Sequence, residues 1–202
     1  MMRLSIVFLA SVLFFSCSRT YTPAEKEYIA SIDKDRKEKD EWMKSDSLSP
    51  FVRDTSAHFA PLKYFPVDLD FKFTSKLYDY PSKDTMIILG TKGEERKVVK
   101  YGFVVWRFRG MDRKINVYKG VSRTGREYYS IWFTDKTTGK ETYHVGRYLD
   151  FQLNPDKNHE YTIDFNEAYS PYCSYSGIYS CAVPSKDDYI DVAITAGEKS
   201  FH

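Results

Sequence analysis

The chain has 202 residues, a formal net charge of +2 at pH 7 and an aromatic content of 17%. The near-balance of acidic and basic side chains argues against a nucleic-acid partner, which would require a clustered basic face. The length suits one domain with a sizeable core, and the aromatic content favours strands.

The N-terminus has the pattern of a bacterial lipoprotein signal. Residues 1–16 contain one charge, Arg3, and the apolar run Leu4–Phe15, which is shorter than the roughly 18 residues that a membrane span requires. The run ends at Cys17, so we predict cleavage before this residue and acylation of its sulfur, with residues 17–22 as a spacer. We therefore expect a protein of the bacterial cell envelope that is attached to the membrane by a lipid anchor and faces the periplasm or the cell surface. In the alternative, the N-terminus is an ordinary cleaved signal, and Cys17 is left as a free thiol or lost with the signal.

A charged helix is predicted over residues 23–44. The sequence Thr22-Pro23-Ala24-Glu25 combines an N-cap, a proline suited to the first helical turn and a capping-box glutamate. Nine consecutive charged residues, Asp33–Glu41, follow within the helix. Charge of alternating sign usually marks solvent exposure, so we expect a solvated helix that spaces the domain from the membrane and packs only at its ends. The alternative is a charged docking face used in envelope assembly.

The pattern of residues 51–202 predicts one β-rich domain. Apolar and polar residues alternate in short runs separated by turns such as Asn154-Pro155-Asp156, which is typical of antiparallel strands. The fold class that we predict is mainly β, an antiparallel sandwich or barrel preceded by the charged helix. The predicted strands are 71–77, 85–89, 98–108, 115–117, 128–133, 143–153, 160–165 and 189–195.

The sequence contains no motif typical of a cofactor site, a metal site or a familiar catalytic set, so we expect no cofactor and no metal. The segment Gly120–Gly125 resembles a phosphate-binding loop, but it joins two predicted strands and opens no helix, so a hairpin turn is the better interpretation. His144 lies on a predicted strand, where a histidine more often makes an ordinary hydrogen bond than acts as a base.

The segment 164–184 is the most unusual part of the domain. It follows a predicted strand, is too long for a hairpin loop and is rich in tyrosine, and long ordered loops are often functional. It also contains Cys173 and Cys181. A disulfide between them suits an exported protein, and closing this loop would stabilise the fold by roughly 2–3 kcal/mol. The alternatives are a reduced, packed pair, or metal ligation completed by His144 or Asp164.

Four polar residues near this segment form a candidate cluster: Arg147, Asp150, Asp164 and Asn166. On a strand Asp164 and Asn166 share a face, and Arg147 would be able to clamp a carboxylate or phosphate through two parallel hydrogen bonds. In the alternative, an Arg–Asp pair fixes the long loop to the sheet and Asn166 forms a turn.

Several motifs together resemble the bacterial family called domain of unknown function 1684. The resemblance covers most of the chain after the signal and does not include the signal itself. It implies a shared domain but no established activity. The matching segments are Phe59–Asp68, Phe133–Tyr143, Gly146-Arg147-Tyr148-Leu149-Asp150, the DFN-x-A-Y-x-P-x-C run from Asp164, and Ala196-Gly197-Glu198-Lys199.

Three functions follow from these patterns. We expect first a non-enzymatic envelope lipoprotein that holds a small molecule or an envelope-protein partner near residues 166–184, with tyrosine walls. The predicted ligand-binding residues are Arg147, Asp164, Asn166 and Tyr169. The second hypothesis is a hydrolase-like enzyme in which Asp164, Glu198 or His144 serves as acid or base and Arg147 binds an anion. The third is a purely structural envelope protein.

Overall fold

The N-terminal helix forms where its capping residues predict it. The computed structural model describes residues 19–122 and 124–202, so Cys17 lies outside the described residues. Helix α1 (Pro23–Ser45) begins at Thr22, whose hydroxyl accepts the N–H of Glu25, while the Glu25 carboxylate accepts the N–H of Thr22. These reciprocal bonds satisfy two otherwise unpaired donors at the helix start. A short helix, α2 (Pro50–Arg53), follows.

The strands confirm the mainly β, antiparallel class. One seven-stranded sheet has the order β2-β4-β5-β6-β7, with β3 paired to β4, and β9 paired to β6 in parallel; β1 and β8 form a separate antiparallel pair. The bounds are β1 (Lys72–Lys76), β2 (Tyr78–Asp79), β3 (Thr85–Leu89), β4 (Glu95–Phe108), β5 (Met111–Val121), β6 (Glu127–Asp135), β7 (Arg147–Phe151), β8 (Glu160–Asp164) and β9 (Tyr189–Ile190).

Two strands, β7 and β9, are much shorter than predicted, each for a local reason. The run from residue 143 is a turn up to Gly146, whose φ of +116° lies in a region that favours glycine. A Cβ at Gly146 would also lie 2.5 Å from the carbonyl oxygen of Phe133. The last strand stops at Ile190, because the N–H of Val192 turns back to the Ile190 carbonyl at 2.7 Å. The segment beyond it leaves the sheet.

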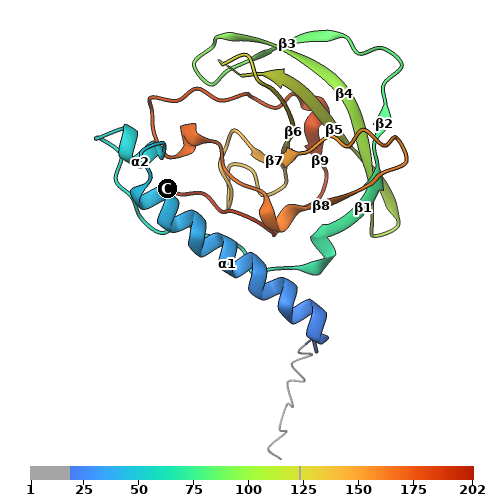
Figure 1. Cartoon of the computed structure of the whole chain (residues 1–202), viewed down its shortest axis with the longest axis horizontal. Coiled ribbons are helices and arrows are strands. Elements are labelled where there is room, and N and C mark those ends of the chain that lie inside the picture. Colours follow the sequence, from blue (N-terminus) through green and yellow to red (C-terminus); the bar gives the residue numbers. More distant parts are fainter. Residues whose placement is uncertain (1–18, 123) are drawn as a thin grey trace, which may run out of the picture.

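The sheet curls, as Figure 1 shows, and the core that it encloses is rich in aromatic side chains. Phe165 has no exposed surface, and its ring lies 5.2 Å from that of Trp106 and 5.1 Å from that of Phe133. Burying one such side chain contributes about 1.5–3 kcal/mol. Phe165 directly follows β8, so the same packing fixes where the long segment after this strand begins.

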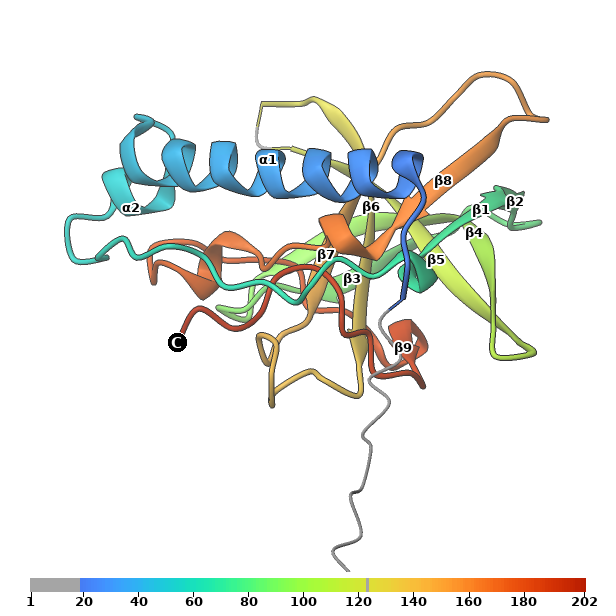
Figure 2. The ribbon, with the colours of Figure 1, turned by 90° about the horizontal axis from the view of Figure 1, so that it is seen from below.

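Helix α1 packs along its length rather than only at its ends. Figure 2 shows it lying across the rest of the domain. Within the charged run, Arg36 donates to the carbonyl of Phe65 at 3.0 Å, and the carboxylate of Asp40 accepts the N–H of Leu62 at 3.0 Å. Ile32, directly before the charged run, is buried. The prediction of a helix that packs only at its ends is therefore wrong: part of the charge satisfies polar groups of the domain.

Candidate functional site

Arg147 is an internal clamp at the start of β7. Its side chain is 1% exposed, and its guanidinium lies 2.7 Å from the carboxylate of Asp135. It also donates to the carbonyls of Ile194, at 2.8 Å, and Ala196. The geometry corresponds to the predicted structural alternative, an Arg–Asp pair, but the partner is Asp135, and the segment that it holds is the C-terminal one rather than the long loop.

Asp164 and Asn166 form a second, separate cluster. The carboxylate of Asp164 accepts the Asn166 N–H at 2.9 Å and the hydroxyl of Tyr28 on α1 at 2.5 Å. The Asn166 side chain exchanges hydrogen bonds with the backbone of Asp68. Burial and the Asp164 carboxylate raise the pKa of Tyr28. Asn166 thus forms a turn, as the structural alternative predicts, and the cluster joins the helix to the loop.

The candidate residues are divided by the alternation of β7. Arg147, Leu149 and Phe151 are buried, whereas Asp150 points outward and accepts the Tyr169 hydroxyl at 2.6 Å. Successive strand residues face opposite sides, so Arg147 and Asp150 cannot share one site. The structure therefore brings Asp164 together with Asn166, and Asp150 with Tyr169, but places Arg147 elsewhere.

Glu198 is also committed to internal contacts. Its side chain has no exposed surface, and it accepts the ammonium of Lys39 at 2.8 Å and the hydroxyl of Tyr175. Burial, and to a smaller extent the negative charge of the Glu198 carboxylate, raises the pKa of Tyr175 well above its ordinary value. This carboxylate therefore fastens α1 and the tyrosine-rich loop to the C-terminal segment.

An open groove of ≈ 1150 Å³ lies beside these clusters. Helix α1 forms one part of its wall, strands β6 and β7 another, and the segment 167–182 a third. Tyr169 is the predicted ligand-binding residue that lines it. The side chains along the groove are Lys39, Trp42, Met43, Arg96, Arg126, Glu127, Tyr128, Tyr129, Ser130, Trp132, Tyr148, Asp150, Phe151, Gln152, Leu153, Glu167, Tyr169, Ser170, Pro171, Tyr172, Tyr179, Ser180, Cys181 and Ala182.

The tyrosines of the groove are neutral aromatic walls with polar tips. Burial raises the pKa of Tyr128, Tyr148 and Tyr172, so each remains a protonated phenol at physiological pH. The Tyr148 hydroxyl donates to the carbonyl of Ala182. The ring of Tyr172 meets that of Tyr179 edge-on, with 5.3 Å between centroids. Such surfaces can hold an apolar face and hydrogen-bonding groups at once.

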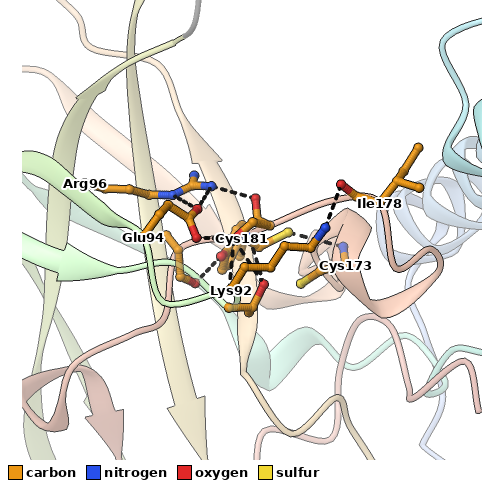
Figure 3. Close-up of polar contacts among 10 residues, drawn as sticks. Lys92, Glu94, Arg96, Cys173, Ile178 and Cys181 are labelled. Atoms are coloured by element: carbon orange, nitrogen blue, oxygen red, sulfur yellow. Dashed lines mark hydrogen bonds and ion pairs between the residues drawn. The ribbon is translucent and has the colours of Figure 1, made fainter.

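Cys173 and Cys181 are neighbouring free thiols (Figure 3), and Cys181 lines the groove. The N–H of Cys173 donates to the sulfur of Cys181 at 3.2 Å. The Cys181 thiol lowers the pKa of Cys173 to about 7, because it donates a hydrogen bond to the Cys173 sulfur. The disulfide stays a prediction for this pair.

The turn between β3 and β4, together with the start of β4, holds the same loop from the other side. Lys92 donates to the carbonyl of Ile178 at 3.1 Å, and Arg96 donates to that of Ser180 at 2.7 Å. The Ser180 hydroxyl donates to Glu94 at 2.7 Å. These contacts, drawn in Figure 3, order the tyrosine-rich segment as a wall of the groove.

We expect Cys173 of the reduced protein to react with iodoacetamide with a midpoint near pH 7, compared with about 8.5 for an ordinary thiol. Below the midpoint the slow protonated form dominates, and above it the reactive thiolate does. Peptide mass spectrometry over a pH series measures the rate. In Cys181→Ala the hydrogen bond is lost and the midpoint should rise; an unchanged midpoint contradicts this assignment. Alkylation only after reduction would establish the disulfide.

In the part of the chain that the structure describes, no three His, Cys, Asp or Glu side chains gather as a metal ion would require. No helix among the same residues is both long and apolar enough to span a membrane. His144 is exposed, with its ring 4.4 Å from that of Tyr143.

Comparisons with known proteins place the domain without assigning an activity. The model of a family described as "Protein of unknown function (DUF1684)" matches residues 57–199. No curated protein matched the chain. The solution NMR structure of an uncharacterised protein from Haloarcula marismortui is similar, with 27% identity and a TM-score of 0.61 over 87% of this chain and 96% of that chain. Because 87% of this chain exceeds what residues 57–202 contain, the structural likeness extends into the N-terminal helical segment.

Proposed function

The chain belongs to the DUF1684 family of proteins of unknown function, and from this premise we propose that its β domain binds a small organic ligand in the groove beside Tyr169. The observation that carries the proposal is the wall of aromatic side chains contributed by three separate parts of the chain. Ligand sites are concave and combine apolar or aromatic walls with placed polar groups, and the groove has aromatic walls interspersed with polar and charged side chains.

Binding is better supported than hydrolysis. An acid or base needs access to a substrate, but Glu198 is fully buried between Lys39 and Tyr175. Asp164 is buried, and its carboxylate is occupied by Tyr28 and Asn166. The guanidinium of Arg147 is enclosed as well. These three groups connect parts of the fold, whereas the groove is accessible.

Ligand binding should raise the melting temperature of the Cys17→Ser variant, which keeps every domain residue. At a ligand concentration 100 times Kd, the expected rise is about 5–10 °C, since binding to the native state alone adds about 2.7 kcal/mol. A screen of metabolites and oligosaccharides by thermal denaturation measures it. Tyr128→Ala, in the groove, should reduce the rise, whereas Tyr189→Ala, an exposed tyrosine on β9 outside the groove, should not. Equal shifts in both variants would place the ligand elsewhere.

We also propose that this domain works at the bacterial cell envelope, anchored through Cys17. Support comes from the apolar run that ends at this cysteine. The anchor and the groove are independent proposals, because one rests on residues 1–17 and the other on the folded domain.

Cys17→Ser should move the protein from the membrane fraction to the soluble fraction, because the acylated sulfur supplies the anchor. Cell fractionation followed by immunoblotting measures the distribution. Cys181→Ser is the matched control and should remain with the membrane. Retention of Cys17→Ser in the membrane fraction would contradict lipidation.

A further inference from the structure

We propose that the groove binds a neutral oligosaccharide. This inference rests on the proposed function and adds the chemical class of the ligand. Three properties of the groove carry it: stacked aromatic surfaces, buried hydroxyls that have no partner among the described residues, and a balanced set of charges.

The aromatic surfaces match the flat face of a sugar ring. A pyranose carries several C–H groups on one face, and these are weakly positive, whereas the face of an aromatic ring is negative. Trp42, Tyr128 and Tyr172 line the groove and are each partly exposed. They come from α1, β6 and the long loop, so rings from three elements border one space.

Two residues that line the groove carry hydroxyls without a hydrogen-bond partner among the described residues, which favours a ligand with hydrogen-bonding groups. Ser170 has 0% exposure, and its hydroxyl is buried with no hydrogen-bond partner in the described part of the chain; the hydroxyl of Tyr179 is in the same condition. Both residues line the groove. A buried, unpaired hydroxyl costs about 1–3 kcal/mol. Both hydroxyls are covered, so a ligand reaches them only when a neighbouring side chain shifts. A polyhydroxylated ligand would then pair with them and remove the cost, whereas a purely apolar ligand would not.

The charges of the groove favour a neutral ligand over an anionic one. Three cationic side chains, Lys39, Arg96 and Arg126, and three carboxylates, Glu127, Asp150 and Glu167, line the groove. Two of the cations are already occupied: Lys39 binds Glu198 at 2.8 Å, and Arg96 binds Glu94 at 2.6 Å. A phosphate or a polyanion would therefore meet little net positive potential.

The size of the groove favours an oligomer over a single sugar. Its volume of ≈ 1150 Å³ exceeds the range of about 300–1,000 Å³ that is usual for small-ligand pockets. It is also open to solvent on one side, which lets a chain extend beyond the walls.

The test is a titration of the Cys17→Ser protein followed by tryptophan fluorescence, because Trp42 and Trp132 both line the groove. The probes are neutral gluco-, xylo-, manno- and N-acetylchito-hexasaccharides, compared with oligogalacturonate, heparin fragments and palmitate. We expect saturable binding of at least one neutral oligosaccharide. Tyr179→Phe, which keeps the ring and removes the hydroxyl, should weaken that binding about 2- to 10-fold.

The same variant has a second readout that separates ligand recognition from folding. Without ligand, Tyr179→Phe should leave the melting temperature unchanged or raise it, because an unpaired buried hydroxyl is lost. Binding of palmitate or the anionic oligomers alone would overturn the saccharide assignment and leave the groove as a ligand site. Binding of no probe, together with no hit in the wider screen, would overturn both proposals. A neutral oligosaccharide that binds Tyr179→Phe as tightly as the parent would also overturn the assignment.

Discussion

Replacing Arg147 by alanine is expected to lower the free energy of unfolding by about 3–5 kcal/mol, because it leaves the buried carboxylate of Asp135 without its partner. The carbonyls of Ile194 and Ala196 also lose their donor. Urea unfolding, followed by tryptophan fluorescence, measures the change as a shift in midpoint.

A matched control for this variant is Arg107→Ala. The Arg107 side chain is 74% exposed, and its guanidinium lies 3.8 Å from the carboxylate of Asp112. Its removal should therefore change the free energy of unfolding by less than about 0.5 kcal/mol. Arg147→Lys separates charge from geometry, since a lysine keeps the charge but not the fork of donors that reaches Asp135 and the two carbonyls. A loss below about 1 kcal/mol for Arg147→Ala would contradict the role of Arg147 as the internal clamp.

Replacing Lys39 by alanine is expected to lower the free energy of unfolding by about 1.5–3 kcal/mol, which is the usual contribution of a hydrogen bond to a charged group. The Glu198 carboxylate would remain buried and keep only the Tyr175 hydroxyl. Amide hydrogen exchange should accelerate along α1, because the helix loses its contact with the C-terminal segment. Unfolding and exchange mass spectrometry measure the two effects.

Lys34→Ala controls for the effect of this substitution on the helix itself. Lys34 lies on the same charged run, and its side chain is 74% exposed beside Glu38. Its removal should change stability by less than about 0.5 kcal/mol, and exchange along α1 should stay as in the parent. Equal effects of the two substitutions would show that the contact between Lys39 and Glu198 does not hold the helix.

The sequence predicted the class of the fold well because the local patterns were strong. The capping residues before Ala24 place the start of α1, and β-branched and aromatic runs place strands such as β3 at residues 85–89. The charged run led to the wrong prediction of a helix that packs only at its ends. Alternating charge is a local pattern, whereas the backbone groups that bond to Arg36 and Asp40 belong to residues more than 20 positions later in the chain. No local pattern shows that a distant carbonyl lacks a donor.

The candidate site was predictable in part for the same reason. The tyrosine-rich segment lines the groove through Tyr169, Tyr172 and Tyr179, as its composition indicated. Grouping Arg147 with Asp150 ignored the alternation of side chains along a strand. The sequence did not identify Asp135 as the partner of Arg147, because Asp135 begins a turn-forming run, where aspartate is common since its side chain bonds to the backbone of the turn. The Asp135 carboxylate does accept the N–H of Thr137 at 2.7 Å.

The docking of α1 along the domain has a geometric consequence for the proposed anchor. Pro23 follows Cys17 closely in the sequence, and Trp42, a wall of the groove, lies near the opposite end of the same helix. At 1.5 Å per residue, about 28 Å of rigid rod separates these two points. A lipid at Cys17 would therefore attach close to one end of a rigid helix rather than to a flexible tether. The helix would set the distance between the groove and the bilayer, and the direction in which the groove opens.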